Sequence, residues 1–203
     1  MKRSKARLYF TLCLPILLSG CGSGGGHYRD ETLYLGGFHA PGSAPGRAPH
    51  DDVSYWDGDG ISGSPSIRID LGEQRAYFYK SGQLVGISAL STGREGYGTP
   101  TGSFKIQQKD RDHVSSIYGD YVDARTGEVV MKDIDRSKDK MPPGCRYDGA
   151  PMPYFMRITG GVGLHEGFLP GYAASHGCIR MPGFMAQKFF ETVSVGTPVS
   201  ISH

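Results

Sequence analysis

The sequence predicts a mainly β fold with one or two short helices and a long lid-like insertion. Glycine accounts for 31 of the 203 residues, which favours turns over long helices. Short apolar segments alternate with polar residues between these turns, and this is the period of half-buried strands. Only one stretch has clear helical spacing. The chain is long enough for one domain with its own core plus additional segments.

The first strands are expected between Ser66 and Ser91. Ile67, Ile69 and Leu71 alternate with polar residues, so one face of this segment is apolar. Turns containing glycine then separate it from further strands at Arg75–Tyr79 and Leu84–Ser91, which together predict a β-meander. Other strands are expected at Phe104–Ile106, Met156–Ile158 and Pro198–Ser202.

The helix is expected at about Met185–Val193. Met185, Phe189 and Val193 recur every four residues, with Pro182 before them and Gly196 after them, so the helix packs one face on the core. The long segment Gln107–Pro151 is charged and only weakly periodic. A connection of that size is typical of a lid or binding loop, in which Lys109, Arg111 and Tyr118 could control entry.

Residues 1–20 have the pattern of an export signal. Lys2, Arg3, Lys5 and Arg7 precede an apolar segment, Leu8–Leu18, that is shorter than the roughly 20 residues needed to span a bilayer. The run Leu18-Ser19-Gly20-Cys21 resembles a bacterial lipobox, which predicts lipidation of Cys21 after cleavage. The alternative is an ordinary secretory signal with a cysteine at its cleavage site. We therefore expect a periplasmic protein attached by lipid to a membrane, the outer one rather than the inner one.

Residues 21–60 are rich in Gly, Ser and Pro and predict a flexible tether. A folded domain is expected at 61–203. A net charge of only +2, without a long basic run, argues against nucleic acid as a partner, because phosphate binding requires concentrated Lys and Arg.

The residues most able to carry chemistry lie near Cys178. Two histidines, His165 and His176, precede this cysteine closely. An adjacent imidazole can take the proton of a thiol and make it a nucleophile. Gly177 permits a tight turn and close approach of a substrate, and the backbone N–H of Cys178 could stabilise an oxyanion. The other cysteine expected in the mature domain is Cys145.

The run Ser175-His176-Gly177-Cys178-Ile179-Arg180 resembles the signature of the L,D-transpeptidase catalytic domain (YkuD-like), as do Ser91-Thr92-Gly93 and Thr99–Phe104. The resemblance extends from about Ser66 to the C-terminus. It implies a β-sandwich-like domain that opens the bond after the third residue of a peptidoglycan tetrapeptide, usually diaminopimelate. D-alanine is released, and the acyl group passes to an amine.

The same resemblance assigns roles to single residues. Cys178 resembles the nucleophile, and His165 the upstream histidine that acts as general base and later as acid. His176 resembles the histidine that shapes the pocket, while Ser175, Gly177 and Arg180 complete the motif. Arg180 could pair with a carboxylate of the stem peptide. The interval between His165 and Ser175 is shorter than usual in the family, so either histidine could be the base; His165 is preferred because its segment is expected to be a strand.

Several alternatives stay open. A structural zinc site could use His165, His176, Cys178 and either Glu166 or Cys145, and Cys145 could form a disulfide with Cys178. The acyl acceptor could be a second stem peptide, a lysine of an outer-membrane protein, or water, which would make the chain an L,D-carboxypeptidase. A non-catalytic cell-wall-binding lipoprotein is a further alternative. The preferred hypothesis requires no metal or organic cofactor and expects a monomer.

Overall fold

The protein was analysed as a computed structural model that describes residues 51–203. Its elements, in chain order, are β1 (Tyr55–Trp56), β2 (Pro65–Asp70), β3 (Arg75–Lys80), β4 (Gln83–Ala89), β5 (Gly102–Lys105), β6 (Gln108–Asp123), β7 (Val129–Asp135), β8 (Cys145–Thr159), β9 (Val162–Glu166), β10 (Ile179–Met181), α1 (Gly183–Thr192) and β11 (Pro198–Ser202). The predicted mainly β fold is confirmed, as are the predicted strands and the helix.

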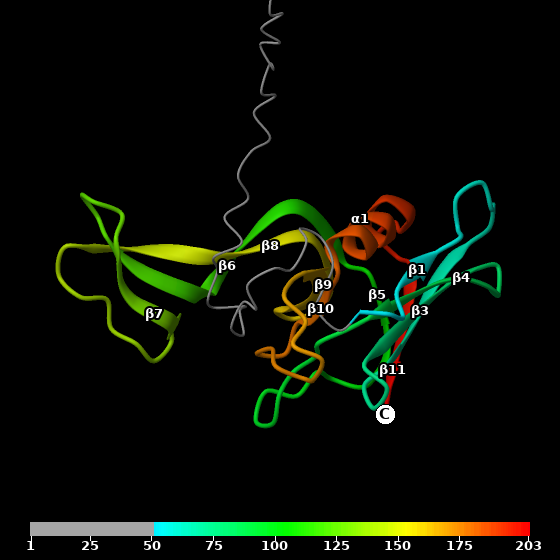
Figure 1. Cartoon of the computed structure of the whole chain (residues 1–203), viewed down its shortest axis with the longest axis horizontal. Coiled ribbons are helices and arrows are strands. Elements are labelled where there is room, and N and C mark those ends of the chain that lie inside the picture. The colour runs from blue at the N-terminus through cyan, green and yellow to red at the C-terminus, as the bar shows by residue number, and fades with distance from the viewer. Residues whose placement is uncertain (1–50) are drawn as a thin grey trace, which may run out of the picture. The chain divides into compact units, whose positions relative to one another are not determined.

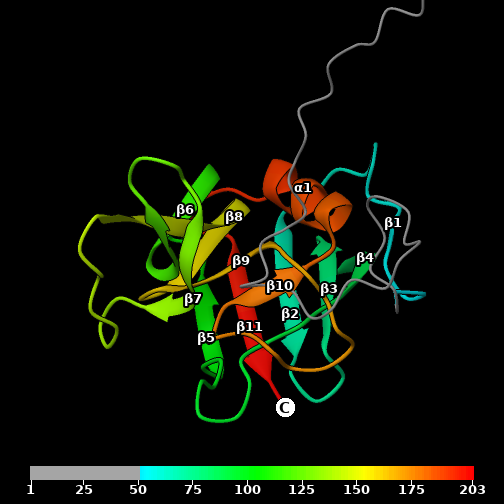
Figure 2. The same cartoon turned by 60° about the vertical axis from the view of Figure 1, so that its left-hand side comes forward.

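The first sheet has six strands in the order β1-β4-β3-β2-β11-β5. The predicted meander β2-β3-β4 is antiparallel, and Ile67 lies opposite Phe78. The C-terminal strand β11 then enters between β2, to which it is parallel, and β5, to which it is antiparallel. Figure 2 shows β11 lying between these two strands.

The second sheet has five strands in the order β10-β9-β8-β6-β7. Its longest members, β6 and β8, are antiparallel and extend together as an arm whose outer edge is β7 (Figure 1). The expectation that 107–151 has little regular structure is therefore wrong. Its charged residues lie on exposed or half-buried positions of strands, and a β-bulge between Val114 and Gly119 interrupts the alternation on which a strand prediction depends.

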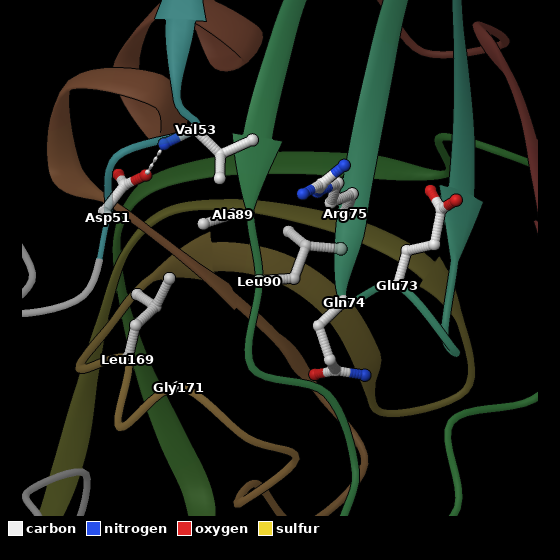
Figure 3. Close-up of a pocket in the computed structure, with 9 residues that line it drawn as sticks. All are labelled: Asp51, Val53, Glu73, Gln74, Arg75, Ala89, Leu90, Leu169 and Gly171. Atoms are coloured by element: carbon white, nitrogen blue, oxygen red, sulfur yellow. Dashed lines mark hydrogen bonds between the residues drawn. The ribbon is translucent and has the colours of Figure 1, made fainter.

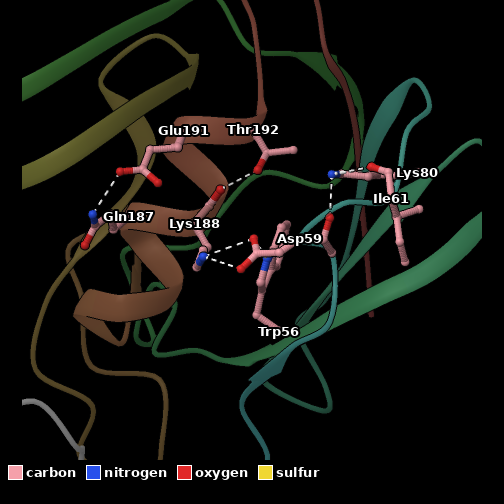
Figure 4. Close-up of polar contacts among 9 residues, drawn as sticks. Trp56, Asp59, Ile61, Lys80, Gln187, Lys188, Glu191 and Thr192 are labelled. Carbon is pink, nitrogen blue, oxygen red and sulfur yellow. Dashed lines mark hydrogen bonds and ion pairs between the residues drawn. The ribbon is translucent and has the colours of Figure 1, made fainter.

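The main core lies where the two sheets and the helix α1 meet. It contains Ile67 and Phe78 from the first sheet, Ile158 and Leu164 from the second, and Phe189 from α1. The Phe189 ring lies 4.7 Å from that of Phe78, in an edge-on contact. Figure 4 shows the exposed side of the same junction, where Lys188 of α1 pairs with Asp59 at 2.7 Å.

The predicted export signal, Cys21 and most of the predicted tether lie outside the described residues. Tyr55 and Trp56, near the end of that tether, already pair with β4. Within 51–203, no helix is long and apolar enough to cross a membrane.

Candidate active site

The turn that carries Cys178 lies just before β10 of the second sheet and is hydrogen-bonded to the segment between β4 and β5. Ser91 and Arg180 exchange both backbone hydrogen bonds at 3.0 Å. Three residues before Cys178, the Ser175 N–H donates to Thr92 O and the Arg94 N–H donates to Ser175 O, both at 3.0 Å. The Ser91-Thr92-Gly93 and Ser175–Arg180 motifs, far apart in sequence, are thus paired in space.

Two polar side chains and one glycine fix the shape of this turn. The Ser175 hydroxyl donates to Cys178 O and accepts from the Gly177 N–H at 3.1 Å. The Thr99 hydroxyl donates to Gly177 O at 2.8 Å and accepts from the Gly93 N–H at 2.9 Å. Gly177 has φ of 111°, a conformation that disfavours any side chain. The roles of Ser175 and Gly177 in this structure are therefore to position the thiol.

The Cys178 thiol is partly buried against the start of β9. Its Sγ lies 3.5 Å from Gly161 O, and the backbone N–H of Gly163 also donates to the sulfur. Burial raises the pKa of the thiol, while the Gly163 hydrogen bond and the positive charges of Arg180 and Arg157 partly offset this shift. In the absence of substrate the structure therefore favours the protonated thiol at neutral pH.

His165 is completely buried on β9, beside Arg180 of β10. Its Nδ1 lies 2.6 Å from Glu166 O, so Nδ1 carries the proton and donates it to this carbonyl. Its Nε2 has no hydrogen-bond partner among the described residues, including Cys178. Burial lowers the pKa of His165 to about 3, and the nearby Arg180 contributes to this shift. The ring is thus neutral, with an unoccupied lone pair on Nε2.

His176 lies in an aromatic and cationic environment, different from that of His165. Its ring stacks on Tyr118 with centroids 4.7 Å apart, and Tyr97 contacts it edge-on at the same distance. The Arg94 guanidinium donates to its Nε2 across 2.8 Å. Burial and the charge of Arg94 lower the pKa of His176 to about 4. Because Nε2 accepts from Arg94, this nitrogen cannot also take the thiol proton.

The remaining motif residue, Arg180, is a buried strand residue that is 3% exposed. Its charge acts on Cys178, His165 and His176. Of the three residues suggested to control entry, only Tyr118 lies at the site. Lys109 donates to Val193 O at the end of α1, and Arg111 lies over the Tyr154 ring.

Sequence reasoning did not single out Arg94, Tyr97 or the side chain of Thr99. The available signal for Arg94 and Tyr97 was their place between two matched motifs, Ser91–Gly93 and Thr99–Phe104, and Thr99 is the first residue of the second motif. In addition, position 93 has no room for a side chain, because a Cβ there would lie 1.9 Å from Tyr97 O. That close approach folds the loop back and brings Arg94 and Tyr97 to His176.

A separate pocket of about 140 Å³ lies elsewhere on the domain (Figure 3). It is lined by Asp51, Val53, Glu73, Gln74, Arg75, Ala89, Leu90, Leu169 and Gly171. Neither Cys178 nor either candidate histidine contributes to it. Gln74 connects it indirectly to the thiol turn, since its side chain exchanges hydrogen bonds with Thr92 at 2.7 and 2.9 Å.

The alternative uses of the cysteines are not assembled in this structure. Cys145 and Cys178 are both free thiols, so the disulfide alternative is wrong for this state. Within 51–203, no three His, Cys, Asp or Glu side chains are grouped so that they could hold a metal ion, which leaves the zinc alternative without a ligand set.

The comparisons with known proteins agree with this geometry. The family model for the L,D-transpeptidase catalytic domain (YkuD) matches residues 64–201. "Probable L,D-transpeptidase 3" of Mycobacterium tuberculosis is 26% identical over 149 residues, which are 70% of this chain and 47% of the relative.

Two solved structures are also similar. A mutant L,D-transpeptidase of Enterococcus faecium has a TM-score of 0.50 and 25% identity, over 70% of this chain and 50% of that one. The Ldtfm-avibactam carbamoyl enzyme has a TM-score of 0.51 and 26% identity, over 69% and 49%. This chain thus spans about half the length of these relatives. With two thirds of its residues matched by the family model, the chain belongs to the L,D-transpeptidase catalytic domain family.

Proposed function

We propose that the protein is a peptidoglycan-remodelling L,D-transpeptidase in which Cys178 is the nucleophile and His165 the general base. The observation that carries this proposal is the tautomer of His165. Its Nδ1 is committed to Glu166 O, and its buried Nε2 has no other partner within 51–203. A proton acceptor in that state, on the strand that also lines the thiol, has the chemistry required of the base.

In the first half-reaction, Sγ of Cys178 attacks the carbonyl carbon between diaminopimelate and the terminal D-alanine. The thiol proton passes to Nε2 of His165 as the C–S bond forms. The two groups form no hydrogen bond in the free protein, so binding of the donor must bring them into line. His165 then returns the proton to the amine of D-alanine as the C–N bond breaks, leaving a thioester on Cys178.

The surroundings of the thiol support negative charge during this step. Arg180 and Arg157 act on Cys178 as positive charges, and Gly163 donates a hydrogen bond to its sulfur. The Gly177 N–H already donates to Ser175. We therefore assign the oxyanion of the tetrahedral intermediate to the backbone N–H of Cys178.

In the second half-reaction the nitrogen of an amine attacks the thioester carbonyl while His165 removes one of its protons. The C–S bond then breaks, and His165 returns this proton to the Cys178 sulfur. A second stem peptide as acceptor gives a crosslink, and a lysine of an outer-membrane protein gives an anchored protein. Water in the same position gives an L,D-carboxypeptidase. The acyl-enzyme step common to all three is supported by a relative of 26% identity that forms a carbamoyl enzyme with avibactam.

We propose that the enzyme lies in the periplasm and is attached to a membrane by lipid on Cys21. This part depends on the sequence alone. Labelled palmitate should be incorporated into the full chain in bacteria and lost in Cys21→Ala. Label that remains on the variant would contradict the lipobox assignment.

The enzyme assignment is tested with the full chain and purified tetrapeptide muropeptides, followed by mass spectrometry. We expect release of D-alanine and a thioester adduct on Cys178. Cys178→Ala should abolish both, whereas Cys145→Ala, which removes the other described thiol, should retain them. Equal D-alanine release from wild type and Cys178→Ala would overturn the nucleophile. No release from the wild type would favour the non-catalytic wall-binding alternative.

The choice of base is tested separately with His165→Gln and His176→Gln. We expect His165→Gln to lower the rate of acylation at saturating donor by roughly 100-fold or more, in line with the usual contribution of a general base. His176→Gln should retain a larger share of that rate, because its Nε2 is occupied by Arg94. The reverse order of the two effects would make His176 the base.

A further inference from the structure

We propose that Arg94 forms a carboxylate-binding subsite beside the thiol that orients the acyl donor. This inference rests on the proposed function, because the donor is a stem peptide that carries free carboxylates. Two of them lie close to the bond that is cleaved: the terminal carboxylate of D-alanine, and the carboxylate on the side chain of diaminopimelate.

Arg94 is a cation that the protein leaves without a counter-ion. Within 51–203, none of the ion pairs includes it. Its guanidinium instead donates to the neutral His176 ring and lies 4.8 Å from the centre of the Tyr97 ring. An arginine has five N–H donors, and a hydrogen bond to one imidazole nitrogen leaves most of them for a ligand. A carboxylate is the group that matches this fork and its charge.

The backbone of Arg94 is hydrogen-bonded through both its N–H and its carbonyl. Its backbone N–H donates to Ser175 O, and its carbonyl accepts from the Tyr97 N–H at 2.9 Å. The side chain then contacts both the Tyr97 ring and Nε2 of His176. Since His176 lies two residues before Cys178, this charge is tied to the same turn as the thiol. A ligand anion bound here would therefore be placed relative to the nucleophile at little entropic cost.

The charges around Arg94 carry both signs. Lys138, on the segment that follows β7, lies 5.5 Å from the Tyr97 ring, on which Arg94 also stacks. Lys138 is paired with Asp135 at 3.1 Å, so these two charges largely cancel. Asp133 also acts on this region, and Arg94 and Arg180 both act on Asp133. Of Arg94, Arg180 and Lys138, only Arg94 is both exposed and outside every ion pair among the described residues.

A first experiment tests the subsite without a peptidoglycan substrate. The rate of Cys178 alkylation in the full chain is measured with iodoacetate, which carries a carboxylate, and with neutral iodoacetamide, in a Cys145→Ala background. We expect Arg94→Ala to lower the ratio of the two rates by about tenfold, the effect of losing one charge-assisted hydrogen bond. Arg94→Lys should restore part of the ratio. An unchanged ratio in Arg94→Ala would overturn the subsite.

Arg68→Ala is the matched control. Arg68 also stacks on a tyrosine, Tyr77, at 4.1 Å, but it belongs to the six-stranded sheet. We expect this variant to keep the wild-type ratio. A fall as large as that of Arg94→Ala would show that general surface charge, rather than a subsite, sets the preference.

A second experiment identifies the carboxylate. Three tetrapeptide donors are compared: the free acid, one with a C-terminal D-alaninamide, and one with an amidated diaminopimelate side chain. For the free acid we expect Arg94→Ala to raise KM by about tenfold and to change kcat less. The donor whose amidation removes this sensitivity carries the recognised carboxylate. Equal sensitivity with all three donors would overturn the assignment to a donor carboxylate.

The two experiments separate this proposal from the proposed function. If the wild type released no D-alanine, the transpeptidase assignment would fail, while the iodoacetate preference would still report the anion site. If D-alanine were released but the iodoacetate preference did not depend on Arg94, the enzyme assignment would stand and the subsite would fail.

Discussion

At the scale of single residues, the candidate site combines a thiol and an imidazole that are both held neutral. Burial raises the pKa of Cys178 and lowers that of His165 to about 3. Each shift disfavours the charged form of its group. A preformed thiolate–imidazolium pair is therefore not the resting state, and proton transfer is expected to accompany attack on the donor.

This resting state predicts how Cys178 reacts with iodoacetamide. A raised thiol pKa means that less thiolate is present at any pH below it, so alkylation should be slow at neutral pH. The rate should continue to rise through and beyond pH 8.5, about the pKa of a free cysteine. The measurement is the alkylation rate against pH in Cys145→Ala. A plateau reached near neutral pH would show that the thiolate is already formed.

Gly163 donates a backbone hydrogen bond to the Cys178 sulfur. A Cβ at this position would lie 2.6 Å from the Phe155 ring and 2.7 Å from Met156 O. Gly163→Ala should therefore lower the free energy of unfolding by about 1–3 kcal/mol, the usual cost of overpacking, and should also reduce acylation of Cys178. Urea denaturation measures the first effect.

Gly161 offers a control two residues away. A Cβ there would meet no atom within 4 Å. Gly161→Ala should change the free energy of unfolding by no more than about 0.5 kcal/mol. Equal losses in the two variants would show that steric contact with β8 is not the cause.

At the scale of elements, the β6–β8 arm brings Tyr118 to the candidate active site. A bulge between Val114 and Gly119 interrupts the ladder just before Tyr118 turns toward His176. The Tyr147 hydroxyl of β8 lies 2.7 Å from Ser115 O and 2.6 Å from Tyr118 O, at both ends of this bulge. The Tyr147 hydroxyl therefore holds this bulge in place.

Removal of that hydroxyl should affect catalysis more than folding. In Tyr147→Phe we expect kcat/KM for the donor to fall several-fold, because Tyr118 loses its fixed position on His176. The free energy of unfolding should fall by about 1 kcal/mol, the typical worth of one hydrogen bond. Tyr77→Phe removes a hydroxyl contact to Glu73 on the other sheet and should leave kcat/KM unchanged. A similar loss of kcat/KM in both variants would argue against a specific role for the bulge.

The helix α1 contributes through its buried face. Phe189 is fully buried and contacts Phe78 and Trp56, whose ring centres lie 4.7 and 6.1 Å away. Phe189→Ala should cost about 3–5 kcal/mol of stability. Lys188→Ala, at the adjacent half-buried position, removes the ion pair with the exposed Asp59 and should have little effect, because solvent screens such pairs. Thermal unfolding of the two variants provides the comparison.

At the scale of the whole molecule, the two site histidines make stability depend on pH. Their folded pKa values, about 3 for His165 and about 4 for His176, lie below the ordinary value of 6.5. Below pH 6.5 the unfolded chain therefore binds more protons than the folded one, and the folded state loses stability as pH falls toward these values. Above pH 6.5 the histidines contribute no dependence.

We accordingly expect the free energy of unfolding to fall when the pH is lowered from 6.5 to 4. Buried His165 can contribute up to about 1.4 kcal/mol per pH unit, and the partly exposed His176 less. His165→Gln should reduce the slope in urea titrations at several pH values, because glutamine does not titrate. An unchanged slope in this variant would show that other groups cause the acid sensitivity.

The sequence by itself determined the parts of this protein that are encoded locally. Alternating apolar residues defined β2 and β3, fourfold spacing defined α1, and the run around Cys178 identified the family through a contiguous motif. Such signals depend on neighbours in the chain, so they can be read without knowing the fold.

Only the tertiary structure decided how the site is assembled. It separated the two histidines by burial and partner, with Nε2 of His165 left open and Nε2 of His176 bound to Arg94, 82 residues away in the chain. It also formed β6 and β8 from a segment whose bulges hide the strand period, and so brought Tyr118 to His176. These features arise from contacts between distant segments. Burial and hydrogen-bond partners set the protonation of Cys178 and His165, and both exist only once those segments meet.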